Sequence, residues 1–442
     1  MKPVFSLSLH ARYRCEDSGV CCSSGWAISI EPSRGIPLEA DWRAGRIQFP
    51  LVPVPAAPLV PVPAPDLATR PSLFTRPPGL PADEYGVLPL AADGACAFHD
   101  AVHRRCHVQR QRGHDALPRA CRLFPRVCLI DPRGVSVSLS HYCPTAARTL
   151  FTDAPVTIVQ DPPAFPRDAE YEGLDASDAY PPLLRPGVLL DWETLSALER
   201  HLVQVLDEER HSVDAALRRA DALCEHLRAW TPDGPPLLER LRSSVSLAAT
   251  VDPGGAAGDQ SAGDQWEASR RLTGADLLAL DADVRGAIPA AILPASARPG
   301  DTLARETHRL DAARDALDAR FVRPVCRYLA ARLFGSWCWY LGHGLRTLMQ
   351  SLRAAYAVLT VEAAADGAAV VDGDGAVDGD EAWLREAIRR ADLVLLHLAS
   401  RQALAARWSR AETLAEEGCR PYSHEGRWAR IASTRKDVSN QE

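Results

Sequence analysis

The sequence predicts an α+β protein that is predominantly α, with a small cysteine-rich domain containing short strands followed by a larger helical region. Three observations predict this class. Eight of the 12 cysteines lie between residues 15 and 143. Segments with strand-like alternation fall within the first 150 residues. From residue 188 onward, apolar residues recur at steps of three and four, as on one face of a helix. A chain of 442 residues suggests about two to three domains.

Residues 1–150 are expected to form the cysteine-rich domain. VFSLSL and WAISI alternate as short strands do. Residues 99–113 predict a short helix that ends at Gly113, and a second helix is expected to begin at the proline of ALPRACRLFPR. VCLIDPRGVSVSLS predicts a hairpin with D-P-R-G as its turn.

Two proline-rich segments separate the ordered parts. Residues 50–85 begin with PLVPVPAAPLVPVPAP, where dense proline removes backbone donors and predicts a polyproline-like loop. This loop is interpreted as an insertion between two halves of one domain, or else as a ligand for a proline-reading partner. Residues 151–187 are proline-rich and acidic, and they are interpreted as a linker or surface wrap.

The helical region is expected to span residues 188–442. Helices are predicted over 191–210 and 213–230, over the most apolar stretch at 319–360, and over 381–400 and 401–417. Two glycine- and aspartate-rich inserts, 251–266 and 364–380, are predicted to be mobile.

Charge and hydropathy exclude some classes of function. The net charge of −7 gives no electrostatic reason to expect nucleic-acid binding. The sequence contains no run of about 18 or more apolar residues, so we expect no membrane span. The first residues lack the apolar core of a signal peptide, so we expect a cytoplasmic protein. Disulfides are rare in that compartment, and clustered cysteines there more often bind metal or do chemistry.

The crowded thiols predict a soft-metal site, because thiolates select zinc, copper(I) or iron–sulfur clusters. Redox-active thiols and inert buried cysteines are the alternatives. No C-x2-4-C knuckle of a zinc finger is present, so tertiary folding must bring the ligands together. Four thiolates satisfy one zinc or one iron–sulfur cluster, and more allow spare thiols or two metals. The candidate ligands are Cys15, Cys21, Cys22, Cys96, Cys106, Cys121 and Cys143.

Neighbouring side chains point apart in extended backbone, so the vicinal pair Cys21–Cys22 is expected to give one ligand to a given metal. His99, His103 and His107 would share one helix face, either as a zinc site or as a solvated surface.

His141 precedes Cys143 by two residues and is a candidate ligand or a donor to one. His343 is interpreted as a hydrogen-bonded core histidine rather than a catalytic base. Arg122 and Arg126 either lower thiol pKa values beside the site or cap helices and pair with acids.

These motifs resemble those of a known family. The motifs C-x5-CC-x3-W, G-x-C-x-F, C-x-V, L-P-x-x-C-R-x-F-P-R and S-L-S-x-x-C-P-x-A-A-R are similar to those of the YkgJ-type cysteine-cluster proteins, which bind zinc or iron. Within that family the chain resembles the flagellin lysine-N-methylase branch called FliB. The resemblance covers residues 1 to about 150, and more weakly the helical C-terminal region.

The resemblance implies that the seven candidate cysteines hold an iron–sulfur cluster or zinc. It also implies a protein-lysine N-methyltransferase that uses S-adenosylmethionine on flagellin or another protein. Cys128 falls outside the family pattern. The first motif has only C-x5-CC where the methylases carry an extra cysteine, and no G-x-G-x-x-G context or C-x3-C-x2-C signature is present. A non-enzymatic zinc- or iron-binding interaction protein is therefore the alternative, followed by a thiol-redox or metal-delivery role.

Overall fold

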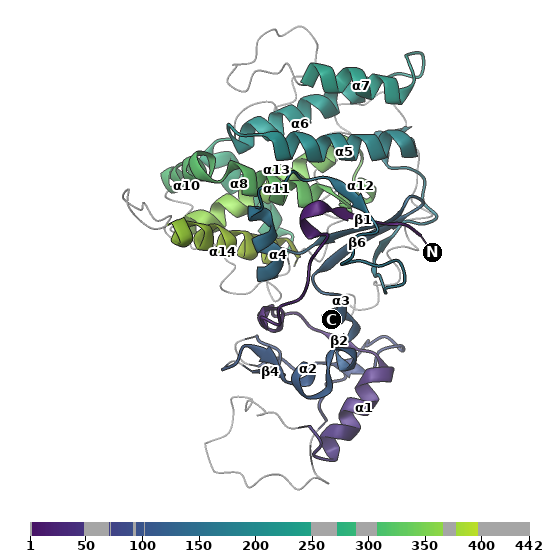
Figure 1. Ribbon diagram of the computed structural model, residues 1–442, viewed down its shortest axis with the longest axis vertical. Helices are drawn as coiled ribbons and strands as arrows, with labels where there is room; N and C mark the ends of the chain where they lie inside the picture. The colour runs from purple at the N-terminus through teal and green to yellow at the C-terminus, as the bar shows by residue number, and fades with distance from the viewer. Residues whose placement is uncertain are drawn as a thin grey trace. The chain divides into compact units, whose positions relative to one another are not determined.

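The structure is a computed structural model that describes residues 2–47, 70, 72–91, 94–100, 102–248, 272–288, 307–365 and 377–396 (Figure 1). The prediction of a mostly helical α+β protein is confirmed. The chain divides into two compact units. The first, which we call the sheet-and-helix unit, comprises Met1–Arg14 and Pro125–Tyr422. The second, the cysteine-rich unit, comprises Cys15–Phe124 and Ser423–Glu442, of which the last segment lies outside the described residues.

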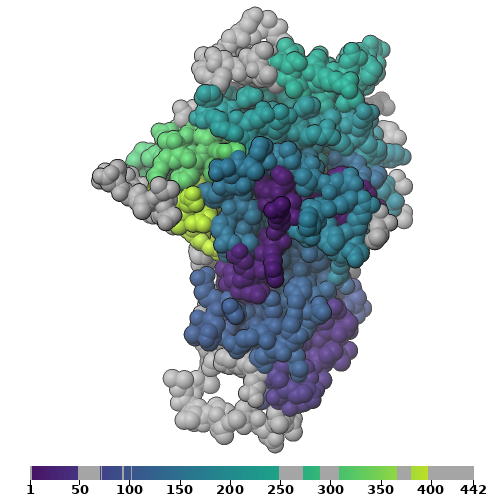
Figure 2. All heavy atoms as spheres, viewed as in Figure 1, coloured from purple at the N-terminus to yellow at the C-terminus, as the bar shows by residue number. Residues whose placement is uncertain are grey.

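This division differs from the expected boundary at residue 150, and the first strand explains why. Strand β1 (Val4–Leu7) is a strand as predicted, but it pairs in parallel with β7 (Gly134–Leu139), with Val4 opposite Val135. Val4 and Leu7 are buried there. Figure 2 shows the dark purple N-terminal residues seated among blue atoms of later residues of this unit. The chain thus begins in one unit, leaves it at residue 15 and returns at residue 125.

The sheet of this unit has five strands in the order β8-β1-β7-β6-β9. The remaining strands are β6 (Arg126–Asp131), β8 (Ile158–Gln160) and β9 (Gly173–Asp175). Strands β6 and β7 form the predicted hairpin, with Asp131 opposite Gly134. Strands β8 and β9 occupy the two edges. Residues 151–187 therefore contribute sheet edges, and they are not only the linker that their prolines suggested.

Helices cover one face of the hairpin through polar contacts as well as apolar packing. Helix α11 spans Val322–Leu333, and the Ser138 hydroxyl donates a hydrogen bond of 2.7 Å to the Ala331 carbonyl. In the short helix α12 (Cys338–Leu341), the Tyr340 hydroxyl donates to the Asp131 carboxylate at 3.1 Å. Arg133, in the hairpin turn, pairs with Asp131 and with Glu199 of α5 (Trp192–Glu208). The turn residues therefore fix the sheet to the helices.

The helical part is built around α13 (Leu345–Ala365), most of whose side chains are buried. Its neighbours are α6 (Val213–Arg228), α8 (Gly274–Gly286), α10 (Thr307–Arg320), α11 and α14 (Val377–Leu396). Helix α7 (Leu237–Ala248) packs on α5 and α6. The predicted helices at 191–210 and 213–230 are confirmed. Asp191 and Ser212 cap them by accepting backbone N–H groups of Thr194 and Ala215.

Four expectations for the helical region need to be compared with the structure. The apolar stretch 319–360 is helical as expected, and it is divided among the end of α10, α11, α12 and α13, with turns at Gly335 (φ 60°) and Gly344 (φ 130°). The expected insert 364–380 ends early, since α14 begins at Val377. Residues 251–266 and 401–417 lie outside the described residues. Among the helices that are described, none is long and apolar enough to cross a membrane.

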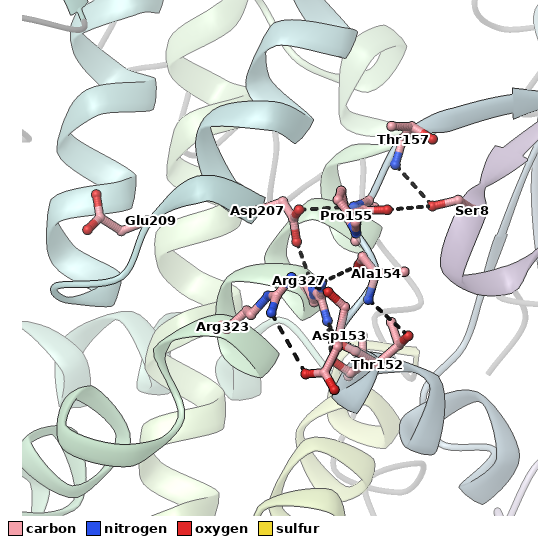
Figure 3. A network of polar contacts seen from close by, with 12 residues as sticks. Ser8, Thr152, Asp153, Ala154, Pro155, Thr157, Asp207, Glu209, Arg323 and Arg327 are labelled. Carbon is pink, nitrogen blue, oxygen red and sulfur yellow. Dashed lines mark hydrogen bonds and ion pairs between the residues drawn. The ribbon is translucent and has the colours of Figure 1, made fainter.

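A buried arginine ties the segment after α4 (Pro144–Arg148) to the helices (Figure 3). Arg327 of α11 is fully buried and bonds Asp207 of α5 at 2.7 Å. It also donates to the carbonyl oxygens of Thr152 and Ala154, while the second Asp207 oxygen accepts the Val156 N–H at 2.9 Å. Arg327 therefore joins α5 to the segment after α4 through one carboxylate and two backbone carbonyl groups.

The cysteine-rich unit has short elements around a small core. Strand β2 (Ser29–Ile30), from the predicted WAISI strand, pairs with β3 (Gly86–Val87), and β4 (His99–Asp100) pairs with β5 (Arg105–Cys106). The helices are α1 (Pro32–Arg43), α2 (His107–Arg112) and α3 (Arg119–Leu123). Trp42, Phe74 and Phe98 lie in one apolar core that also contains Cys96. The proline-rich residues 51–69 lie outside the described residues.

Candidate metal centre

Five of the seven predicted ligands gather in the cysteine-rich unit. The Cys22 thiol interacts with the thiols of Cys21 and Cys106. The thiols of Cys96 and Cys121 interact electrostatically with Cys21 and Cys106. These side chains come from four separate segments, namely a 3-10 turn at Val20–Ser23 (η2), the loop before β4, strand β5 and helix α3. We call these five side chains the thiol cluster.

Glycine allows the η2 turn to approach the β4–β5 hairpin. Gly19 precedes the turn with φ 69°, a conformation that L side chains rarely adopt. A Cβ atom at Gly19 would lie 2.0 Å from the carbonyl oxygen of Arg104. Arg104 itself has φ 52° in the hairpin turn. The two backbones therefore touch directly, and this contact sets the position of Cys21 and Cys22 relative to Cys106.

Further backbone contacts hold the cluster. The Cys96 N–H donates to the Cys22 carbonyl at 2.7 Å. Cys106 lies opposite His99 in the hairpin, and the His107 N–H donates to the Phe98 carbonyl at 2.9 Å. Cys22, Cys106 and Cys121 pack against the core that contains Cys96. The same core that stabilises the unit therefore also orients its thiols.

The vicinal pair does not have the extended backbone that was expected. Cys21 and Cys22 lie in η2, where the chain turns, and their thiols interact with each other. The argument that extended neighbours point apart therefore does not apply here. The glycine at position 19, two residues before the pair, is the sequence signal that indicates a turn.

Hydrogen bonding and burial separate the thiols by pKa. The hydrogen bond from Cys22 lowers the pKa of Cys21, and it lowers the pKa of Cys106 to about 7. Those two hydrogen bonds raise the pKa of Cys22. Burial raises the pKa of Cys96 to about 12 and that of Cys121 well above its usual value. The thiolate form is therefore favoured at Cys106 and disfavoured at Cys22, Cys96 and Cys121.

The remaining cysteines lie elsewhere. Cys15 is exposed, and its thiol is 3.8 Å from the Asp17 carboxylate. Cys143 belongs to the sheet-and-helix unit, where its sulfur is 3.5 Å from the Tyr13 hydroxyl. Cys128, Cys224 and Cys326 are buried in that unit, Cys338 is partly exposed there, and Cys419 lies outside the described residues. None of the described cysteines forms a disulfide.

The predicted helix over 99–113 is wrong in its first half, so the three histidines do not share a helix face. His99 lies in β4, His103 in the hairpin turn and His107 at the start of α2. Asp100 explains the turn, because its carboxylate accepts the backbone N–H groups of Val102 and His103. His103 also bonds the Asp100 side chain at 2.8 Å.

Two other histidines differ in burial. His141 is fully buried and its Nε2 lies 3.3 Å from Nε2 of His10, with the Tyr328 ring 5.5 Å away. Its closest polar partner is thus another imidazole in the sheet-and-helix unit. The interpretation of His343 as a core histidine is wrong, because the residue is exposed after α12.

The two arginines of CRLFPR have different partners. Arg122 pairs with Glu31 at 3.2 Å and donates to the Leu117 carbonyl. Arg126 belongs to the other unit and lies over the ring of Tyr171 at 5.8 Å. Glu31 was not singled out in the sequence, yet it interacts electrostatically with Cys121 and accepts the Arg119 N–H at 3.1 Å. No local motif marks this glutamate.

The donor set of the thiol cluster fits a soft metal in type and number. Five thiols exceed the four that one zinc ion or one iron–sulfur cluster needs. Within the described ranges, no three His, Cys, Asp or Glu side chains already have the arrangement of a metal site. The thiols nevertheless support metal binding, because they are the right type of donor and lie in one place.

Replacing Gly19 by alanine is expected to disturb the thiol cluster. The added methyl group would overlap the Arg104 carbonyl, and we expect a loss of stability of about 3 kcal/mol from the positive φ and the overlap combined. Gly25 is the matched control, because its φ of 75° is similar but no atom lies within 4 Å of its Cβ position. Gly25→Ala should cost about 1 kcal/mol. Thermal unfolding and metal titration of both variants test this, and equal effects would contradict it.

Three comparisons with known proteins gave no match, whether to a protein-family model, to a curated protein or to a solved structure.

Proposed function

We propose that the chain is a thiolate-ligated metalloprotein whose thiol cluster binds an iron–sulfur cluster or, alternatively, zinc. The observation that carries this proposal is the gathering of thiols from four separate segments. Cys15 and Cys143 lie outside the thiol cluster, and we propose them as metal ligands on the resemblance alone.

The chain's own residues have distinct roles in this proposal. Cys96, Cys106 and Cys121 would each give one thiolate, and the Cys21–Cys22 turn would give at least a fourth. The Cys96 amide and the Cys22 carbonyl hold two of these segments together before any metal binds. When bound, zinc would cross-link the four segments, and an iron–sulfur cluster would in addition supply a redox centre.

Metal analysis of anaerobically purified protein tests the proposal. A brown sample whose broad absorbance near 400 nm is lost on oxidation would support an iron–sulfur cluster, and a colourless sample with stoichiometric zinc would support the zinc alternative. Protein that retains neither metal after reconstitution would contradict both. The proposal places the protein in the cytoplasm, where its thiols remain reduced.

Protein-lysine methylation with S-adenosylmethionine is the activity that we propose on the resemblance. The substrate would be flagellin or another protein. A non-enzymatic zinc- or iron-binding interaction protein is the alternative, and no cofactor pocket in the described residues decides between them. Calorimetry with S-adenosylmethionine and the metal-loaded protein separates these proposals, since absence of binding would favour the non-enzymatic one.

Metal binding is expected to release protons, because metals bind thiolates. Cys22, Cys96 and Cys121 have raised pKa values and carry protons at neutral pH. We expect zinc binding at pH 7 to release about two to three protons and affinity to rise as pH increases through 7 to 9. Calorimetric titration in buffers of different ionisation enthalpy measures the number. A proton count near zero would mean that these thiols are not ligands.

A further inference from the structure

Two cysteines of the thiol cluster pack against the same core and are both accessible. Cys22 and Cys106 both contact the core that contains Cys96, their thiols interact, and each is partly exposed. Cys96 is only 6% exposed and lies within the core. A solvent-borne oxidant would therefore meet Cys22 and Cys106 before it meets Cys96.

The backbone holds these two cysteines together without a metal. The Gly19–Arg104 contact lies three residues before Cys22 and two before Cys106, so it brings both chain segments to the same place. The Cys22 carbonyl is fixed by the Cys96 N–H, next to the hairpin that carries Cys106. The pair is therefore anchored on both sides by contacts that involve no side chain.

The alternative pairing within η2 is disfavoured by geometry. Consecutive Cα atoms lie about 3.8 Å apart across a trans peptide, whereas disulfide-bonded cysteines usually have Cα atoms about 4.4–6.8 Å apart. A Cys21–Cys22 bond would thus strain the chain. Cys22 and Cys106 both pack against the core that contains Cys96, whereas Cys21 is not among the residues that do.

We infer that Cys22 and Cys106 form a disulfide when the metal-free thiol cluster meets a peroxide, so that bound metal and disulfide are alternative states of one site. This inference rests on the proposed metal site. One thiol takes an oxygen atom from hydrogen peroxide to become a sulfenic acid, and the O–O bond breaks with release of water. The second thiol then displaces a second water as the S–S bond forms. Two thiols and one peroxide give one disulfide and two waters, with two electrons passing from sulfur to oxygen.

Peptide mapping tests this pairing directly. Metal-free protein is treated with hydrogen peroxide, free thiols are alkylated, and trypsin digestion is followed by mass spectrometry without reduction. Cleavage after arginine gives the peptides Cys15–Arg34 and Cys106–Arg110. We expect these two peptides to be linked with a loss of two hydrogen atoms, and fragmentation to place the link at Cys22. Loading with zinc should lower the yield of this link about tenfold or more, because the thiolates are then ligands.

Matched variants complete the test. Cys21→Ser protein should retain the link, and Cys22→Ser protein should lose it. If a variant does not fold, the fragment ions of the linked wild-type peptides still show whether Cys15, Cys21 or Cys22 carries the link. A link through Cys15 or Cys21, no link at all, or an equal yield with and without zinc would overturn the inference. Zinc content is measured in parallel. If the protein binds zinc but forms no link, the disulfide inference fails and the proposed metal site stands. If the link forms but no metal binds, the proposed metal site fails.

Discussion

Replacing Cys96 or Cys121 by serine is expected to remove the metal and to unfold mainly the cysteine-rich unit. Structural zinc contributes about 10–16 kcal/mol of apparent binding free energy, which in such proteins is also folding free energy. A serine hydroxyl is a poor ligand for a soft metal, so we expect at least about a 100-fold loss of metal affinity. Metal analysis measures the loss of metal, and hydrogen exchange followed by mass spectrometry shows which unit unfolds.

Cys128→Ser and Cys224→Ser are the matched controls. Both thiols are 1% exposed and lie in the sheet-and-helix unit, so serine buries a hydroxyl at these sites too. These variants should keep their metal while losing some stability in their own unit. Equal loss of metal from both sets would refute the assignment of ligands to the thiol cluster.

Replacing Arg327 by methionine is expected to destabilise the sheet-and-helix unit by about 3–5 kcal/mol, because it leaves the buried Asp207 carboxylate without its cation. Asp207 is 4% exposed and would keep only the Val156 N–H among the hydrogen bonds described above. The carbonyl oxygens of Thr152 and Ala154 would also lose their donor. Urea unfolding, followed by hydrogen exchange in this unit, measures the change.

Arg323, one helical turn away on α11, supplies the control. Its side chain is 28% exposed and donates to the Asp153 carbonyl, so Arg323→Met should cost about 1 kcal/mol or less. The double variant Asp207→Asn with Arg327→Met should recover part of the loss, since no buried charge then remains unpaired. A cost for Arg327→Met as small as that for Arg323→Met would show that the network does not stabilise the unit.

Local patterns predicted local structure well. The D-P-R-G turn formed as expected, and the helices that begin after Asp191 and Ser212 carry the capping residues that mark such starts. The pairing of β1 with β7 could not be predicted, because strand alternation says nothing about which strand is the partner. The helix predicted at His99 failed for a local reason, since Asp100 satisfies the following backbone N–H groups in a turn.

The site shows the same limit. Residue type identified the thiols, but spacing could not group them, because four distant segments meet only in the folded unit, through backbone contacts and the core around Cys96. Cys121 and Cys143 both fit the family pattern, yet the chain passes from one unit to the other between Phe124 and Pro125. That crossing is a tertiary feature, and no residue near it marks it in the sequence.

The position of β1 inside the sheet has a consequence for synthesis. Its neighbours are β8 and β7, and both follow the whole segment 15–124 in the chain. Ribosomes add about 5–20 residues per second, so the N-terminal strand stays unpaired for several seconds while that segment emerges. All five thiols of the cluster lie between residues 21 and 121, and they leave the ribosome during this interval. The cysteine-rich unit can therefore fold, and bind the proposed metal, before β1 has a partner.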